Sequence, residues 1–292
     1  MEKTPINFKQ KRDFGEIFNA TFTFIGQEFK PLGKVILMYV LPVLLVAAIL
    51  NVLVSIEYQK FFNTFKTDNI EMISSPFAAM AGIYKYLFLY LLVYLLAFTA
   101  LRCSIYSYIK VYVEKGKDQV TMADVWTEIR RFFFPVLGTS ILIGLLVGVG
   151  YILCILPGIW LGVSLCMIFI SLVYEGKGLG KSFDRSFNLI KNNWWVTFAV
   201  ILVSYILVYI LAMVLSIPTM LMGFKSLFSS LKNGGNPGLM NYSTTYYILN
   251  SIITLLTYIM FSVPFIAISF QYFSLVEIKE RPSLEQKIEQ IG

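Results

Sequence analysis

The sequence predicts an all-α integral membrane protein, and its composition and long uncharged segments support this prediction. Of the 292 residues, 57% are hydrophobic and only 14% are charged, whereas a soluble globular domain has about 25% charged residues. Residues 132–174, 192–224 and 233–276 contain no Asp, Glu, Lys or Arg. Each of these segments exceeds the roughly 20 apolar residues that cross a bilayer as a helix. We therefore expect several helices to span a membrane.

Six hydrophobic segments are candidate spans. They cover residues 33–55, 84–109, 135–156, 159–174, 195–222 and 245–275. Leu156-Pro157-Gly158 separates the third span from the fourth, and we expect a tight helical hairpin there because Pro cannot continue a helix and Gly permits a sharp turn. Three further prolines lie within spans and predict kinks: Pro42, Pro218 and Pro264.

Lysine and arginine are distributed unequally between the two sides that six spans create. One side holds the N-terminus, residues 110–134, residues 175–194 and the C-terminus, and with Arg102 of the second span counted on it, this side carries 19 of the 24 Lys and Arg residues. The other side carries the remaining 5: Lys60, Lys66, Lys85, Lys225 and Lys232. Because positive residues favour the cytoplasmic side, both termini are expected to be cytoplasmic. The net charge of +7 then reflects topology and indicates no nucleic-acid partner.

Three segments, 14–33, 122–138 and 179–198, resemble one another. Each has an apolar stripe at helical spacing and is followed directly by a span. The expected stripes are Phe14, Ile17, Phe18, Thr21, Phe22, Ile25 and Phe29, then Val125, Trp126, Ile129 and Phe133, and finally Leu179, Phe183, Phe187, Ile190 and Trp194. We expect each segment to be an amphipathic helix in the cytoplasmic interface that turns into the membrane. Pro31 and Pro135 would then occupy the first turn of the entering helix.

The predicted architecture is one polytopic membrane domain over residues 1–292. It has six transmembrane helices arranged as three helical hairpins, each preceded by a cytoplasmic interfacial amphipathic helix. The repeat units cover about 8–112, 118–174 and 176–278. In the alternative arrangement, the three short helices merely pack on the cytoplasmic end of the bundle.

The stretch EGKGLGKSFDRSF, residues 175–187, resembles a nucleotide phosphate loop at first sight. A phosphate loop needs four residues between its first glycine and the Gly-Lys-Ser triplet, but only three residues separate Gly176 from Gly180. Such a loop must also follow a buried β-strand, and here a membrane-spanning segment precedes it. We therefore expect no ATP or GTP binding.

Residues 155–203 contain the pattern Pro157-Gly158, Glu175-Gly176, Lys181-Ser182, Arg185-Ser186, Leu189, Asn193 and Trp194. In this pattern the segment resembles a bacterial family, the membrane domain of glycerophosphoryl diester phosphodiesterases and its stand-alone uncharacterised six-helix relatives. The opening segment at 14–32 is similar to that of the family as well. The resemblance implies a six-helix membrane domain of the bacterial cytoplasmic (inner) membrane. It implies no hydrolase activity, because the sequence contains no catalytic phosphodiesterase barrel and no histidine.

Five charged residues are candidate site residues. Arg102 lies within the second span, either as a functional charge or as a side chain that extends to the cytoplasmic headgroups. Glu175 ends the fourth span, as a solvated carboxylate or as a partner of Arg185, Lys181 or Arg102. Lys177, Lys181 and Arg185 recur every four residues and are expected to contact lipid phosphates. The alternative is that these three cations pair with Glu175, Asp184 or the C-terminal carboxylates.

Small residues predict where helices approach closely. Gly144 and Gly148 form a GxxxG motif in the third span, and Gly158 and Gly162 form one in the fourth. We expect them to pack the hairpin against itself rather than to form a dimer. Cys103, Cys154 and Cys166 lie in apolar segments and are interpreted as buried hydrophobic side chains rather than as disulfides or metal ligands.

The sequence offers no catalytic, cofactor-binding or metal-binding constellation. It has no histidine and no pair of intramembrane carboxylates for acid–base work. We therefore expect a non-enzymatic membrane protein, a scaffold or accessory subunit whose partners are membrane lipids or another membrane protein or complex. The alternative is a transporter or lipid-handling protein with a midplane polar cavity. The side chains available to line that cavity include Ser204, Tyr205, Asn250, Thr254 and Thr257.

A reporter fused after Gly292 tests the predicted orientation. We expect a reporter that functions only in the cytoplasm to be active, because 19 of the 24 positive residues lie on the side of both termini. A fusion that is active only outside the membrane would contradict both the orientation and the even number of spans.

Overall fold

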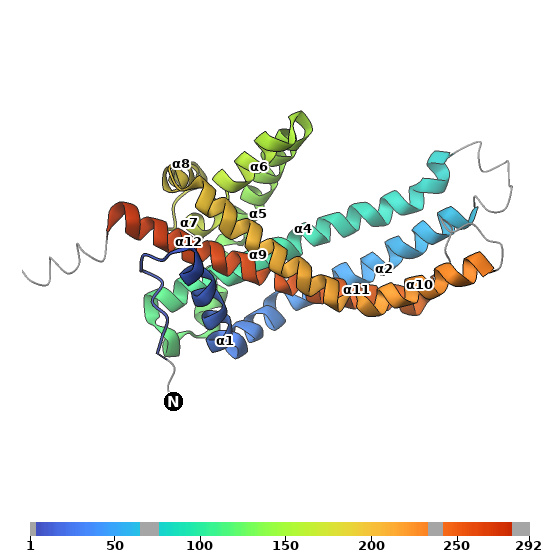
Figure 1. The fold of residues 1–292 in the computed structure, drawn as a ribbon, viewed down its shortest axis with the longest axis horizontal. Coiled ribbons are helices and arrows are strands. Elements are labelled where there is room, and N and C mark those ends of the chain that lie inside the picture. Colours follow the sequence, from blue (N-terminus) through green and yellow to red (C-terminus); the bar gives the residue numbers. More distant parts are fainter. Residues whose placement is uncertain (1–3, 65–75, 233–241, 282–292) are drawn as a thin grey trace, which may run out of the picture. The chain divides into compact units, whose positions relative to one another are not determined.

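The computed structural model describes residues 4–64, 76–232 and 242–281 (Figure 1). Within these ranges the regular secondary structure is entirely helical. The α-helices are α1 (Phe14–Tyr39), α2 (Leu41–Thr64), α4 (Pro76–Lys115), α5 (Met122–Leu153), α6 (Ile155–Ser164), α7 (Ile168–Tyr174), α8 (Leu179–Ile190), α9 (Trp194–Leu215), α10 (Ile217–Lys232), α11 (Thr244–Met260) and α12 (Ser262–Glu280), with a short 3-10 turn at Lys117–Gln119. The expected all-α class is confirmed for this part of the chain.

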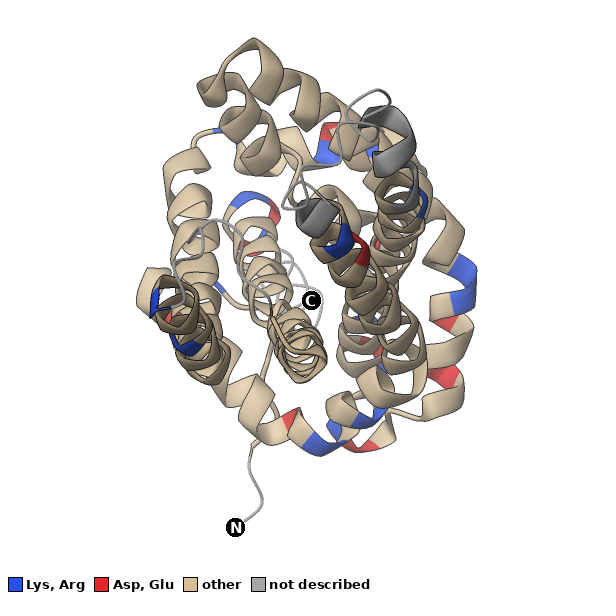
Figure 2. Cartoon of the chain, turned by 90° about the vertical axis from the view of Figure 1, so that its right-hand side faces the viewer, with Lys and Arg blue, Asp and Glu red and all other residues tan. Residues whose placement is uncertain are grey.

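Six helical stretches of the described chain are long and apolar enough to cross a membrane, which confirms the expected number. They are Leu41–Phe61, Ile83–Lys115, Met122–Leu153, Ile155–Tyr174, Trp194–Leu215 and Thr244–Glu280. Charged residues are sparse along these helices, so most of the ribbon in Figure 2 is tan. These are the helices of a multi-pass membrane protein.

The chain divides into two compact units, each built from distant segments. Unit 1 consists of Met1–Val40, Phe98–Leu207 and Phe261–Gly292, and unit 2 consists of Leu41–Ala97 and Val208–Met260. In unit 1, α5 packs on α6 and α7, α8 packs on α6 and α7, and α12 packs on α1 and α8. In unit 2, α11 packs on α2 and α10. The threefold repeat expected from the sequence stays a prediction.

The prolines inside the expected spans mark helix breaks. A single non-helical residue interrupts the chain shortly before each of them: Val40 before Pro42, Ser216 before Pro218 and Phe261 before Pro264. Each proline thus falls in the first turn of the next helix, where its missing N–H leaves no hydrogen bond unmade. We expected the first span at 33–55, and the structure corrects its start. Helix α1 continues to Tyr39, and the candidate span begins at Leu41.

Helix α1 differs from the expected interfacial helix in its length and its buried face. Its N-terminus is fixed by a capping box between Asp13 and Glu16. We expected Pro31 at the start of a new helix, but α1 runs through it. The reason is that one buried stripe continues on both sides of Pro31. That stripe is Ile17, Thr21, Phe24, Glu28, Leu32, Val35 and Ile36. Phe14, Phe22 and Phe29 of the expected stripe are exposed, so the buried face is rotated around the helix.

The second and third expected interfacial segments, 122–138 and 179–198, also differ from the expectation. Helix α5 passes through Pro135 without the expected turn, and its buried stripe is Val125, Ile129, Phe132, Val136 and Thr139, together with Gly150. Helix α8 remains a separate helix and buries Ser182, Ser186, Leu189 and Ile190. Asn192 follows α8 with a φ of 72°, a left-handed conformation that asparagine tolerates better than most residues.

The hairpin between α5 and α6 turns at Cys154, one residue with an extended backbone, rather than at Pro157-Gly158. Pro157 and Gly158 belong to the first turn of α6. A Cβ at Gly158 would lie 2.7 Å from ring atoms of Tyr151, and one at Gly150 would lie 3.0 Å from the Gly158 Cα. The close approach is therefore made by Gly150 and Gly158.

The other expected packing glycines are not at this close approach. A Cβ at Gly144 or Gly148 would meet no described atom within 4 Å, apart from its neighbours along the chain, and one at Gly162 would be 4.0 Å from Val147 Cγ1. Gly144 and Gly148, which the GxxxG spacing singled out, lie further from the turn than the point where α5 and α6 meet. These positions therefore provide a matched control for Gly158.

Replacing Gly158 with alanine is expected to destabilise the protein by about 1–3 kcal/mol, because the added methyl group overlaps Tyr151. Gly148→Ala is expected to be neutral or slightly stabilising, since alanine favours the helix and the site is open. Thermal unfolding in detergent measures both variants. Equal melting temperatures for the two would contradict the packing at Gly158.

Candidate functional site

The N-terminal segment lies along α12 and is held there by an aromatic cluster. Phe8 is buried and stacks on Phe270, with ring centroids 4.3 Å apart and an interplanar angle of 3°. The backbone N–H of Arg12 donates to Ser274 Oγ at 2.9 Å, and this hydroxyl donates back to the Arg12 carbonyl at 3.1 Å. These contacts place Lys9 beside the final turns of α12.

Glu175 directly follows α7 and receives three polar partners. Arg185 Nε donates to its Oε1 at 2.8 Å, and Lys177 Nζ lies 2.6 Å from its Oε2. The Tyr272 hydroxyl of α12 also donates to Oε1. Glu175 thus takes Arg185, one of the three partners considered from the sequence, and it links the α7–α8 connection to α12.

Arg185 joins two carboxylates that are 105 positions apart in the chain, Glu175 and Glu280. Besides its bond to Glu175, its guanidinium donates from Nη1 and Nη2 to the two carboxylate oxygens of Glu280, the second at 2.9 Å. This two-point geometry suits the planar fork of arginine and is not available to lysine. The Arg185 side chain is 17% exposed, so water screens the bridge only partly.

A cavity of about 230 Å³ lies beside this bridge. Its walls come from the N-terminal segment, the end of α7, α8 and the second half of α12. The lining residues are Lys9, Tyr174, Glu175, Arg185, Tyr272, Phe273, Val276, Glu277 and Glu280. Charged and aromatic side chains therefore share one space at the ends of two helices that are apolar enough to cross a membrane.

The surroundings of Glu175 favour its charged form. Burial by itself raises the pKa of a carboxyl group, but the bonds from Lys177 and Tyr272 and the charge of Arg185 outweigh burial and lower the pKa of Glu175 overall. For Arg185, the hydrogen bond to Glu280 and the charge of Glu175 outweigh burial and raise the pKa. Both groups are consequently ionised at neutral pH.

The three cations that we expected at lipid phosphates are placed differently from one another. Arg185 and Lys177 form internal ion pairs, as in the alternative considered from the sequence. Lys181 is exposed. The spacing of four residues predicted a shared face, but it carried no information about the carboxylates of α12, which lie nearly a hundred residues away.

Arg102 is enclosed by aromatic rings within unit 1. Its Cζ lies 3.8 Å from the ring centroid of Phe169, 4.9 Å from that of Phe98 and 5.1 Å from that of Phe265. Its Nη1 donates to Ser140 Oγ at 3.1 Å. The sequence allowed two interpretations of this side chain, a functional charge or one that extends to the headgroups. Cation–π contact stabilises the guanidinium among these rings.

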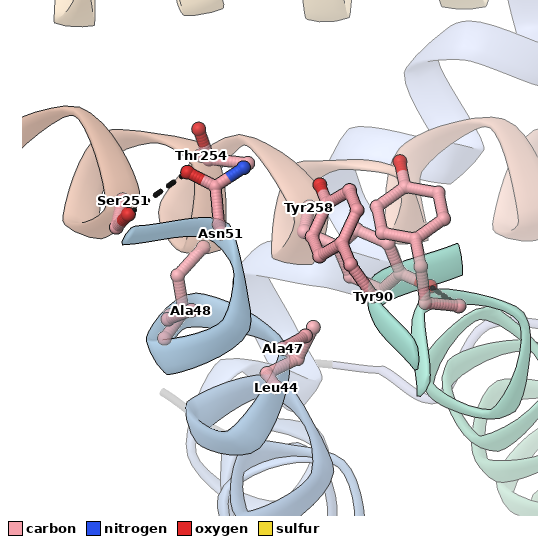
Figure 3. A pocket seen from close by; sticks show the side chains of 10 residues that line it. Leu44, Ala47, Ala48, Asn51, Tyr90, Ser251, Thr254 and Tyr258 are labelled. Atoms are coloured by element: carbon pink, nitrogen blue, oxygen red, sulfur yellow. Dashed lines mark hydrogen bonds between the residues drawn. The ribbon is translucent and has the colours of Figure 1, made fainter. Parts of the chain in front are cut away.

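Unit 2 contains a small cavity of about 20 Å³, shown in Figure 3. Ser251 Oγ donates to Asn51 Oδ1 at 3.0 Å across it, and Thr254 and Tyr258 lie on the same helix (Figure 3). Thr254 is the one member of the five residues considered for a transport cavity that lines this space. The volume is sufficient for a single water molecule and too small for an organic substrate.

Several site residues were not recognised from the sequence. They are Lys9 and Tyr272 at the cavity, Glu277 and Glu280, which were considered only as unspecified C-terminal carboxylates, and two polar contacts, Lys110 with Glu128 at 2.6 Å and Tyr108 with Glu28 at 2.6 Å. Glu277 and Glu280 are spaced three apart at the end of an apolar span, and this is the signal that could have identified them.

The cysteines differ from one another in burial. Cys103 is buried as expected, Cys166 is intermediate and Cys154, at the hairpin turn, is exposed. Among the described residues, no group of three His, Cys, Asp or Glu side chains could hold a metal ion. Comparisons with protein families, with curated proteins and with solved structures gave no match to this chain.

Acidification tests the role of Glu175. A carboxyl group whose pKa is lowered on folding stabilises the folded state above its unfolded pKa, and this contribution is lost as the pH falls through the folded value. We expect wild-type stability to decline below the ordinary glutamate pKa of about 4.3. Glu175→Gln should cost about 2 kcal/mol at neutral pH and should reduce the decline.

Asp184→Asn is the control for this measurement, because Asp184 is exposed on α8 and the substitution removes the same charge. Melting temperatures measured from pH 7 to pH 3.5 compare the three proteins. An unchanged acid decline in Glu175→Gln would show that other carboxylates cause it.

Proposed function

We propose that this chain is a non-enzymatic, multi-pass protein of the bacterial cytoplasmic membrane that serves as a scaffold or accessory subunit and binds a membrane lipid or a membrane partner. The observation that carries the proposal is the cavity of about 230 Å³ at the ends of α7 and α12, where charged and aromatic side chains meet. A concave space with a few polar groups at fixed positions is typical of a binding site.

The orientation of the chain supports this proposal. Both ends of the chain lie on the side that carries 19 of the 24 Lys and Arg residues, which the positive-inside rule assigns to the cytoplasm. The cavity includes Lys9 and Glu280 from segments near those ends. It would then lie at the cytoplasmic headgroup level, where it is accessible to lipids and to partner proteins.

The exposed apolar residues of α1 add a second surface to this proposal. Phe22 is 48% exposed and Phe29 is 71% exposed, beside a stripe that is buried in the protein. Aromatic side chains on the flank of a helix near Lys30 and Lys34 suit the boundary between headgroups and acyl chains. We propose that α1 lies in this boundary. This is the position expected for the first of the three interfacial helices, each of which precedes a helical hairpin.

The geometry supports a binding role more than the alternative of a transporter. A transporter binds its substrate near the midplane between helices. The cavity of unit 2 includes polar side chains such as Asn51 and Thr254, but its volume of about 20 Å³ matches one water molecule. The larger cavity of unit 1 lies at the end of its helices. The membrane-domain family that the sequence resembles likewise implies no catalytic chemistry.

Purification from native membranes into nanodiscs, followed by mass spectrometry of the retained lipids and proteins, tests the proposal. We expect one lipid class or one membrane protein to be retained at near-stoichiometric amounts. Val276→Trp places a large ring in the cavity and should reduce retention about tenfold or more.

Val149→Trp is the matched control, because Val149 is 54% exposed on α5 and is not part of the cavity. It should leave retention unchanged. Equal retention by both variants, or a wild-type protein that retains no lipid or partner above background, would contradict the proposal.

A further inference from the structure

We infer that the first half of α5 carries a lipid site of its own, which holds the phosphate of an anionic phospholipid. Trp126, Arg130 and Arg131 form the headgroup part of this site, and Phe134 begins its acyl-chain part. The inference goes beyond the proposed cavity, because none of these residues lines it.

Arg130 is held against a stack of aromatic rings. Its Cζ lies 5.2 Å from the ring centroid of Trp126, about one turn earlier on α5. The Trp126 ring stacks in turn on Tyr39 of α1, with centroids 4.9 Å apart and an interplanar angle of 7°. The Tyr39 hydroxyl donates to the Met122 carbonyl at 3.4 Å. A cation–π contact orients the guanidinium without using its five N–H donors, so these can bind phosphate oxygens.

Arg130 and Arg131 are adjacent exposed cations, and neither forms an ion pair within the described ranges. Both carboxylates of α5 are engaged by lysines of α4, Glu128 at 2.6 Å and Asp124 at 2.8 Å. The first half of α5 therefore has two positive charges that the described part of the protein does not neutralise. Arginine binds phosphate through two parallel hydrogen bonds, which makes a phosphate the fitting counterion.

Trp126, Arg130 and Phe134 are spaced four residues apart and so lie along one face of α5. Phe134 is 75% exposed, and exposed Ile141 and Leu145 continue this face. With a rise of about 1.5 Å per residue, Ile141 lies about 16 Å beyond Arg130 along the helix. This distance matches one leaflet, which is half of a hydrocarbon core about 30 Å thick. One lipid molecule can thus contact the guanidinium with its phosphate and the apolar residues with a chain.

The sequence around this face fits the boundary between headgroups and acyl chains. Arg131 is the last charged residue before the uncharged segment 132–174, and Met122–Leu153 is apolar enough to cross a membrane. Tryptophan and arginine are typical of this boundary. An anionic lipid is favoured over a zwitterionic one, because a zwitterionic headgroup brings its own cation beside two arginines. Soluble phosphate lacks the chain that the apolar face would contact.

Native mass spectrometry of delipidated protein tests the inference, with dioleoyl phosphatidylglycerol and dioleoyl phosphatidylcholine added at equal concentration. We expect the glycerol lipid to be retained about tenfold more than the choline lipid, because two basic residues attract its charge. Arg130→Gln/Arg131→Gln should bring this ratio close to one.

Lys11→Gln/Lys191→Gln is the matched control, because it removes two exposed cations at other places in unit 1. Its ratio should stay within about twofold of the wild type. A wild type without preference for the glycerol lipid, or an equal loss of preference in the two double variants, would overturn the inference.

Two single variants separate a shaped site from positive charge alone. Arg130→Lys keeps the charge and loses the planar fork, whereas Trp126→Leu keeps both arginines and removes the ring beside Arg130. Each should lower the ratio about threefold. Trp126 also packs on Tyr39, so Arg130→Lys decides if Trp126→Leu does not fold. An unchanged ratio in Arg130→Lys would show attraction by charge alone and would refute the site.

Two further measurements identify the source of the phosphate and the place where it binds. Preincubation with excess inorganic phosphate should leave the glycerol lipid bound, and displacement would contradict a role for the apolar face of α5. Val276→Trp fills the cavity and should leave the ratio unchanged. A preference that disappears in Val276→Trp would assign it to the cavity, which refutes this inference and leaves the proposed function standing.

Discussion

The two-carboxylate bridge of Arg185 is the constraint on which the organisation of unit 1 depends. In a chain with 14% charged residues, few charges are available to fix the ends of apolar helices. Arg185 uses its fork to join Glu175, after α7, to Glu280, at the end of α12. Because a half-buried charge is costly without a partner, each of these groups restricts the position of the others. The bridge thereby fixes α8 against α12 and leaves the cavity beside them.

The N-terminal segment is restrained by the same helix in a different way. Its attachment to α12 is mostly apolar, through the stacked pair of Phe8 and Phe270 and the edge contact of Phe8 with Phe273. Apolar contact is tolerant of small shifts, whereas the paired hydrogen bonds between Arg12 and Ser274 are directional. Packing and hydrogen bonding together define where Lys9 stands relative to Glu277, although the two residues are far apart in the sequence.

Hydropathy was sufficient to predict the all-helical class and six candidate spans, because bilayer thickness imposes a minimum length on every span. It could not predict which face of α1 is buried. In a membrane protein both the protein-facing and the lipid-facing sides of a helix are apolar, so periodicity does not separate Phe24, which is buried, from Phe22, which is exposed. Pro31 led us to expect a new helix at that position. Packing of α1 on both sides of Pro31 outweighs the free energy that a proline costs inside a helix. The cavity was not foreseen because Glu175, Arg185 and Glu280 meet only through tertiary structure.

The electrostatics of the site bear directly on the choice between binding and catalysis. A general base at neutral pH needs a pKa near 7, which buried carboxylates reach when their charged form is disfavoured. Around Glu175 the opposite occurs, because Lys177, Tyr272 and Arg185 stabilise the charged form and lower its pKa. Each of these donors also occupies a carboxylate oxygen that would otherwise accept a substrate proton. An environment of this kind holds Glu175 as a fixed negative charge. Together with Lys9 in the same cavity, a fixed charge is suited to recognising the pattern of charges on a ligand.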